Sequence, residues 1–196
     1  MNRRLFFKSG IAGIGTLSFA NSLLALKYYP NPCDKKCAIL YSTWCGSTRD
    51  AAVWISEGMG GIADVFDVRE LPDLKNYDHI IIGGAIRAGV TSETLQTYLA
   101  DNNEWLKEKV SGFFAVCGNM GQPVGPQQTA MFIDNHLAKL CKVENKPSRI
   151  FLGRITKSLM DSQTAKMMEG FDDYDNLKRA DCLGFGKDLL TDIIKS

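Results

Sequence analysis

The residues best suited to chemistry form one short run, Ser42-Thr-Trp-Cys-Gly-Ser-Thr48, between an apolar segment at 38–42 and an alanine-containing segment at 48–59. Backbone N–H groups and hydroxyls arranged around the start of a helix suit the binding of a phosphate group. Gly46 lets the backbone approach a ligand closely, and Thr43, Ser47 and Thr48 carry hydroxyls that can donate. The run has no lysine, and it matches neither the P-loop nor the Gly-x-Gly-x-x-Gly turn. An ordinary strand-to-helix turn with a Ser/Thr cap is the alternative interpretation.

The spacing of apolar residues predicts strands that alternate with helices. Expected strands span 38–42, 63–68, 79–85, 112–117 and 149–155; expected helices span 48–59, about 92–106, a stripe from 133 to 141, and 177–194. Nearly continuous apolar strands separated by helices are typical of a parallel sheet covered on both faces. We therefore predict one α/β domain at 38–196, a three-layer αβα fold with five parallel strands in the order 2-1-3-4-5.

In that strand order, three loops converge beyond the carboxyl ends of the strands, where such folds bind their ligands. The loop after the third strand is rich in small residues, which let the main chain lie against a flat ring. A monophosphate held without positive charge beside such a ring predicts a mononucleotide, with flavin mononucleotide (FMN) as the leading candidate. The predicted cofactor-binding residues are Ser42, Thr43, Trp44, Cys45, Gly46, Ser47, Thr48, Ala85, Ile86, Arg87, Ala88, Gly89, Cys117, Gly118, Asn119, Met120 and Gly121.

Three segments carry a resemblance to a known family: Tyr41 to Thr48, Asn76 to Gly89, and Arg149 to Ile155. From about residue 38 to 194, the chain resembles flavodoxin-fold proteins, nearest to the flavodoxin-domain branch that includes the menaquinone-dependent protoporphyrinogen oxidases. The first segment looks like the family's Ser/Thr-x-x-Gly-x-Thr phosphate loop. Within the second, Ala-Ile-Arg-x-Gly resembles the branch's loop beside the isoalloxazine ring. The resemblance implies a flavodoxin-like fold and FMN as cofactor.

The chain departs from this family at the ring end of the expected site. Flavodoxins usually hold the flavin between aromatic side chains, and the position that is often Tyr in the oxidase branch is Ala88 here. Losing one such partner removes roughly 0.5–1.5 kcal/mol of stacking. Trp44 and the loop around Met120 are the candidates to replace it. Arg87 is the one charged residue expected near the ligand, with surface packing as its alternative role.

The first 26 residues are predicted to be an export signal rather than part of the fold. Arg3 and Arg4 precede Phe6, Phe7 and Lys8, and a mildly apolar stretch follows, which resembles a twin-arginine (Tat) signal. An ordinary secretory signal or an uncleaved anchor is the alternative. We expect residues 27–37 to be a linker, the Tat machinery to be a partner, and the protein to be periplasmic or otherwise extracytoplasmic. No stable membrane span is expected after cleavage.

The charge balance excludes some partner classes. Outside residues 1–26, the chain has 20 of its 23 basic residues and all 22 acidic ones, so the net charge of the remainder is −2. No basic run occurs there, and the sequence therefore predicts no nucleic-acid binding. This balance is also less acidic than is typical of flavodoxins, which meet basic redox partners.

The cysteines and histidines suggest structural roles more than chemistry. A disulfide among Cys33, Cys37 and Cys141 is one possibility, since an exported protein allows disulfides. Cys182 lies on an apolar helix stripe and is expected in the core. A Cys45–Cys117 bridge is not expected, because strands two spacings apart lie roughly 9.6 Å from each other. Cys45 is either a reactive thiol at a helix N-terminus or a small loop residue contacting phosphate.

No metal site is predicted, because the two histidines have no ligand spacing. No side chain is required as a general acid or base if a flavin supplies the chemistry. We therefore expect an exported FMN-binding protein that transfers electrons to a redox partner protein or a quinone. The alternatives are a quinone-coupled oxidoreductase of the protoporphyrinogen oxidase type and a binding module that has lost its flavin.

Overall fold

The computed structural model describes residues 34–118 and 124–195. The expected signal at 1–26 and the linker from 27 to 33 lie outside the described residues. So do three predicted site residues, Asn119, Met120 and Gly121, and one member of the cysteine trio, Cys33.

A five-stranded parallel sheet forms the middle of the domain. Its strands are β1 (Cys37–Tyr41), β2 (Ala63–Asp67), β3 (His79–Ile86), β4 (Val110–Cys117) and β5 (Ser148–Leu152). They lie in the order β2-β1-β3-β4-β5, and every neighbouring pair is parallel. Every residue of β1 is buried, which explains its continuous apolar sequence. The predicted fold class and strand order are confirmed.

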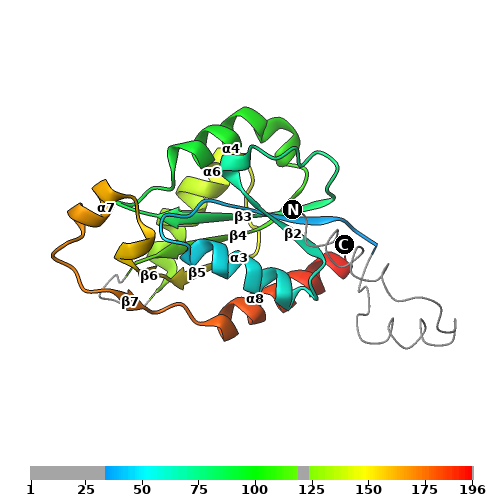
Figure 1. Ribbon diagram of the computed structural model, residues 1–196. Helices are drawn as coiled ribbons and strands as arrows, with labels where there is room; N and C mark the ends of the chain where they lie inside the picture. Colours follow the sequence, from blue (N-terminus) through cyan, green and yellow to red (C-terminus); the bar gives the residue numbers. More distant parts are fainter. Residues whose placement is uncertain (1–33, 119–123, 196) are drawn as a thin grey trace, which may run out of the picture. The chain divides into compact units, whose positions relative to one another are not determined.

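Helices cover both faces of this sheet (Figure 1). On one face, α3 (Ser47–Gly58) packs along α8 (Arg179–Lys195). A Cβ atom added to Gly186 would lie 2.2 Å from the carbonyl oxygen of Ile55, so this close helix contact requires glycine. On the other face lie α4 (Glu93–Leu106) and a continuous helical run made of α5 (Pro126–Thr129), η2 (Ala130–Ala138) and α6 (Lys139–Cys141).

The main apolar core lies between the sheet and the α4 face. Alternate residues of the central strands point to this face, as the two-residue period of a strand requires. They pack against the apolar stripe of α4 and the end of η2. The fully buried members include Leu40, Ile80, Ile82, Leu95, Leu99 and Leu137.

The structure differs from the predicted strand at 149–155. The fifth strand of the sheet ends at Leu152, and a separate strand β6 (Arg154–Ile155) pairs antiparallel with β7 (Tyr174–Asp175). A Cβ atom on Gly153 would lie 2.9 Å from Val116 Cγ1, so the chain turns tightly against the end of β4. The connecting segment contains η3 (Lys157–Leu159) and α7 (Ser162–Met167), neither of which was predicted.

The crossover from β2 to β3 contains only the short turn η1 (Val68–Glu70) instead of a full helix. A helix is the usual connection between parallel strands. Its absence leaves part of the α4 surface uncovered. Within the described residues, no helix has both the length and the apolar character needed to cross a membrane.

Candidate functional site

The predicted phosphate loop joins the end of β1 to the first turn of α3. Gly46 has φ +87°, a left-handed conformation that favours glycine. Its N–H donates to Thr43 Oγ1 at 3.0 Å, and its carbonyl accepts from the N–H of Asp50 at 3.0 Å. The loop therefore turns sharply at Gly46 and enters the helix at once, as the phosphate interpretation requires.

Three hydroxyl side chains of this loop, those of Ser42, Ser47 and Thr48, are buried. Thr48 is 0% exposed, and its Oγ1 has no hydrogen-bond partner. Leaving a buried polar atom unpaired costs about 1–3 kcal/mol, so such an atom in a native structure requires an explanation. A ligand oxygen at the start of α3 would accept this hydrogen bond. The residues present therefore fit a bound phosphate group.

A hydrogen-bonded chain links the phosphate loop to the loop after β3. Ser42 Oγ and Thr91 Oγ1 are 2.9 Å apart, and both side chains are buried. The N–H of Thr91 donates to His136 Nε2 at 2.9 Å. Burial lowers the pKa of His136, which favours the neutral ring that can accept this bond.

The loop after β3 is a tight turn that carries Ala88. The N–H of Arg87 donates to the carbonyl of Val90 at 2.9 Å, and the reverse bond is 3.1 Å. Ala88 and Gly89 have φ of +50° and +87°. β3 ends at Ile86, so Ala85 lies in the strand as the range 79–85 predicts, and Ile86, predicted in the loop, is the last strand residue.

At the tip of these two loops, the structure brings Trp44 and Arg87 together. The guanidinium carbon of Arg87 lies 5.1 Å from the centre of the Trp44 ring. Arg87 also donates to Thr164 Oγ1 of α7 at 3.4 Å, so the unpredicted segment after β6 borders this end of the site. Trp44 is 41% exposed, which leaves indole surface available to a ligand.

Of the loop after β4, which is predicted to form a third wall, the structure describes the first residues, Cys117 and Gly118. Cys117 is buried at the end of β4, and burial raises the pKa of its thiol to about 11. A Cβ atom on Gly118 would lie 2.7 Å from the hydroxyl of Tyr174, so β7 reaches this loop closely. Sequence analysis missed Tyr174. The contributions of 119–121 remain predictions.

The described cysteines test most of the disulfides considered from the sequence. Cys45 and Cys117 form no bridge, as expected. Cys141 is a free, fully buried thiol, so a bridge that includes it is wrong. Its side chain belongs to the buried core between the sheet and α4. A Cys33–Cys37 bridge stays a prediction, because Cys33 lies outside the described residues.

Two further expectations concern the burial of Cys182 and the presence of metal ligands. Cys182 is 0% exposed in the core, as predicted. Within 34–118 and 124–195, no three His, Cys, Asp or Glu side chains gather into a metal site.

Arg154 is the functional candidate that sequence reasoning missed. Its Nη2 lies 3.6 Å from the position a Cβ atom would take on Gly46. It pairs with Asp50 of α3 and, at 3.5 Å, with Asp175 of β7. Burial disfavours its charge, but the two carboxylates outweigh this and raise the pKa of the guanidinium. One signal was available: Arg154 lies near the carboxyl end of the predicted strand at 149–155, at the same sheet edge as the phosphate loop.

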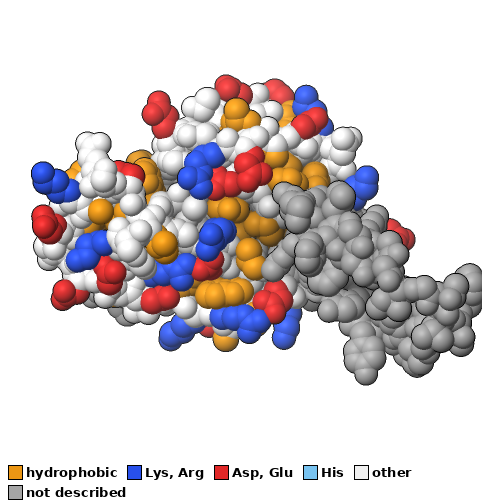
Figure 2. Space-filling view, in the orientation of Figure 1, with side chains coloured by type: hydrophobic (Ala, Val, Ile, Leu, Met, Phe, Trp, Pro, Cys, Tyr) orange, Lys and Arg blue, Asp and Glu red, His pale blue; other side chains and the backbone are white. Residues whose placement is uncertain are grey.

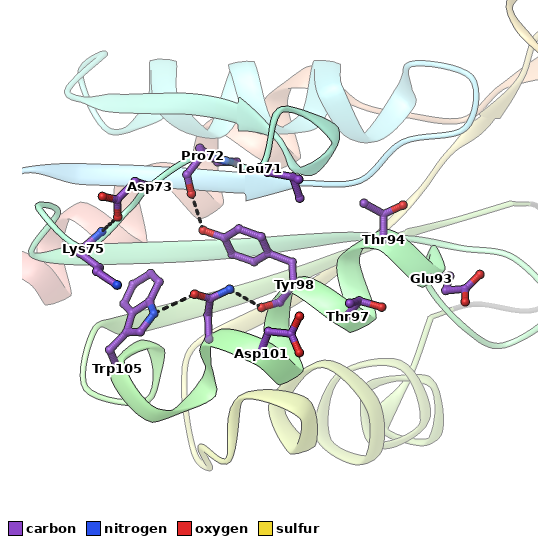
Figure 3. Close-up of a pocket in the computed structure, with 11 residues that line it drawn as sticks. Leu71, Pro72, Asp73, Lys75, Glu93, Thr94, Thr97, Tyr98, Asp101 and Trp105 are labelled. Atoms are coloured by element: carbon purple, nitrogen blue, oxygen red, sulfur yellow. Dashed lines mark hydrogen bonds between the residues drawn. The ribbon is translucent and has the colours of Figure 1, made fainter.

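A separate cavity of about 630 Å³ lies between α4 and the segment at 71–75 of the β2–β3 crossover, where the crossover helix is missing. Figure 3 shows Tyr98 reaching across it to donate to the carbonyl of Pro72 at 2.6 Å. Trp105 and Asp101 line it as well, but none of the described residues of the three loops does. The face drawn in Figure 2 carries interspersed acidic and basic side chains rather than a field of one sign.

Comparisons with known proteins agree with this geometry. Residues 38–172 match the family model described as a flavodoxin domain, so the chain belongs to that family. Protoporphyrinogen IX dehydrogenase [quinone] of Escherichia coli K12 is 33% identical over 86 residues, which cover 41% of this chain and 48% of that protein. The chain thus spans about half the length of the curated relatives it matches.

Solved structures show the same fold at low sequence identity. Flavodoxin bound to flavin mononucleotide from Fusobacterium nucleatum aligns with a TM-score of 0.50 and 14% identity, covering 82% of this chain and 98% of that chain. Oxidised flavodoxin 1 from Bacillus cereus gives a TM-score of 0.50 and 14% identity, with 79% and 97% covered. These alignments show the flavodoxin fold, and the family assignment supports FMN as the cofactor that the sequence predicts.

Proposed function

Because the chain belongs to the flavodoxin-domain family, we propose that it binds FMN and acts as an electron-transfer protein. One observation carries the proposal: the unpartnered, fully buried Thr48 hydroxyl lies in a glycine turn at the start of a helix. When bound, FMN supplies the redox chemistry, since it accepts and releases electrons. The chain's own residues anchor the phosphate through loop N–H groups and hydroxyls. Trp44 and Arg87 border the ring end.

The purified protein tests this proposal directly. We expect flavin bands in its visible absorption spectrum, or quenching of flavin fluorescence when FMN is added to the colourless protein. The bands should bleach on chemical reduction and return in air. A colourless protein that also fails to take up added FMN would contradict both redox functions and favour a module that has lost its flavin.

A quinone-coupled oxidoreductase is the second candidate, and the partial likeness to protoporphyrinogen IX dehydrogenase favours it. Turnover of a porphyrinogen with a menaquinone analogue would support the enzyme. Reduction and reoxidation only by protein partners would support the carrier. Neither function needs an acid–base side chain from the three loops.

We also propose that the protein acts outside the cytoplasm after export by the twin-arginine route. The support is the order of Arg3 and Arg4 before an aromatic pair and a mildly apolar stretch. Replacing both arginines by lysine should keep the full-length chain in the cytoplasm. Export of that variant at the normal rate would point to an ordinary secretory signal instead.

A further inference from the structure

We propose that Arg154 is the cation of the phosphate site and makes the protein select FMN over unphosphorylated riboflavin; this inference rests on the proposed FMN binding. The phosphate loop has no lysine, and the sequence alone predicted a site without positive charge. The fold supplies the charge from a distant segment instead. Arg154 follows Gly153, where the chain leaves the sheet and starts β6.

The position of Arg154 fits this role better than that of its neighbour Arg49. Both guanidinium groups lie near Gly46, with Nη2 atoms 3.6 and 3.8 Å from the Cβ position there. Arg49 has an exposed side chain, whereas the Arg154 side chain is only 15% exposed. A partly buried guanidinium loses less freedom on binding, and its charge is screened less by water.

The phosphate loop and β6 each carry one buried polar side-chain atom that has no hydrogen-bond partner. One is Thr48 Oγ1 in the first turn of α3, and the other is Arg154 Nε, which is buried and has no partner. Both are donors, and one anionic ligand with several oxygens would satisfy donors of this kind together.

The surrounding contacts hold Arg154 in place. The thiol of Cys45 donates to the carbonyl of Arg154 at 3.1 Å, which ties β6 to the phosphate loop. Asp175 is the strand partner of Arg154 across the β6–β7 pair, and Asp50 pairs with its guanidinium from α3. The position of the charge is thus set before any ligand binds, which lowers the entropic cost of binding.

The charges complement the phosphate of FMN. A phosphate monoester carries about −1.5 to −2 near neutral pH. The start of a helix contributes only about half a positive charge. The Arg154 guanidinium adds a full positive charge beside Gly46, which its ion pairs with Asp50 and Asp175 offset. Riboflavin, which lacks the phosphate, gains nothing from Arg154.

A purely structural role for the Asp50–Arg154–Asp175 contacts makes a different prediction. If Arg154 only joins α3 to the hairpin, its loss affects both flavins equally. The affinities of FMN and riboflavin therefore separate the two roles. They are measured by quenching of flavin fluorescence in wild type, Arg154→Lys, Arg154→Gln and the control Arg179→Gln. Arg179 also pairs with an acidic residue of α3, Glu57, but lies at the exposed start of α8.

We expect Arg154→Gln to weaken FMN binding roughly 10- to 100-fold, because a hydrogen bond to a charged group is worth about 1.5–3 kcal/mol. Riboflavin binding should change less than about twofold on the same scale. Arg154→Lys should fall between wild type and Gln, and Arg179→Gln should match wild type. Equal weakening for both flavins, or unchanged FMN affinity in Arg154→Gln, would overturn the proposal.

Two further measurements cover other outcomes. If Arg154→Gln does not fold, the wild-type protein tests the proposal instead. Added salt should weaken FMN binding and leave riboflavin binding unchanged, and equal salt effects on both flavins would overturn the proposed role of Arg154.

If the wild type binds neither flavin, the proposed function fails on its own. Inorganic phosphate then tests Arg154: it should raise the Tm of wild type and Arg179→Gln but not of Arg154→Gln, and no shift in any of them would overturn the inference.

Discussion

The Arg87 guanidinium lies over the indole ring of Trp44, with its central carbon 5.1 Å from the ring centre. The two residues come from the loops after β3 and β1, so this contact joins the two loops at the ring end of the site. Cation–π contacts at exposed positions contribute about 0.5–1 kcal/mol. Arg87 also reaches α7 through Thr164, which places a third segment beside the same end.

The first prediction follows from this contact. Trp44→Ala should weaken binding of FMN and riboflavin alike, by about 0.5–1.5 kcal/mol, because the indole contributes to the ring and not to the phosphate. Fluorescence titration with both flavins measures this. Trp105→Phe is the matched control, because Trp105 lines the separate cavity on α4. Unchanged affinity in Trp44→Ala would remove Trp44 from the ring end.

The second prediction uses two glycines with similar backbone conformations. Gly46 and Gly61 have φ of +87° and +74°, so a side chain at either position should cost about 1–2 kcal/mol of stability. Only Gly46 lies in the phosphate loop; a Cβ on Gly61 meets nothing within 4 Å. Gly46→Leu and Gly61→Leu should therefore lose similar Tm, but only Gly46→Leu should lose FMN. Flavin retention on a desalting column checks this, and yellow Gly46→Leu protein would contradict the phosphate assignment.

Much of the fold could be predicted from the sequence because its signals are local. Apolar runs such as Ile80 to Ile82 indicate strands buried on both faces, and glycine and hydroxyl residues after β1 indicate a turn into a helix. Once five strands alternate with helices, few chain orders remain, and the loops that meet at the carboxyl edge follow from the order. The contact between Ser42 and Thr91 is an example, because the strand order brings the loops after β1 and β3 together.

The parts that were missed depend on contacts distant in the sequence. The β6–β7 pair joins Arg154 to Asp175 across a long connection, and two-residue strands have no periodicity to read. The same contact holds the guanidinium that we propose for the phosphate site. Tyr174 was missed for the same reason. The left-handed conformation of Ala88 was also unpredictable, because alanine gives no signal for it.

The third prediction concerns the hydroxyl pair that joins the first two loops. Ser42→Ala leaves Thr91 Oγ1 buried without its partner at 2.9 Å, and should lower the free energy of unfolding by about 1–3 kcal/mol. Thr91→Val should act similarly. The double variant should cost less than the sum of the two, because both single variants remove the same bond. Urea unfolding measures this cycle, and strictly additive losses would show that the bond is not shared.

The fourth prediction is a pH dependence set by His136. Burial lowers its pKa in the folded state below the ordinary value of about 6.5. The unfolded state then binds more protons below that pH. Stability should be fully present above about pH 6.5 and fall as the pH drops toward the folded pKa. His79, whose pKa is also lowered by burial, contributes in the same direction.

His136→Gln separates the two histidines. Glutamine can accept the Thr91 N–H bond but does not titrate, so this variant should show a smaller loss of Tm between about pH 7 and 5. His79→Gln is the matched comparison, because His79 begins β3 at the amino end of the parallel strands. If His136→Gln keeps the full wild-type slope, protonation of His136 does not control stability in this range.

The fifth prediction concerns the buried thiols and has the opposite sign. Burial raises the pKa of Cys141 to about 12 and that of Cys182 to about 12, whereas an unfolded thiol titrates near 8.5. A raised folded pKa means that the thiols stabilise the fold fully below pH 8.5, and that this stability is lost as the pH rises above it. Urea unfolding between about pH 8 and 9.5 should show the decline. In Cys141→Ala the decline should be smaller, although the baseline stability is lower because the core loses volume.

Native protein should also leave Cys141 unmodified by a thiol reagent that modifies it fully in urea. Rapid modification in the native state would show that Cys141 is accessible and would contradict the buried thiol.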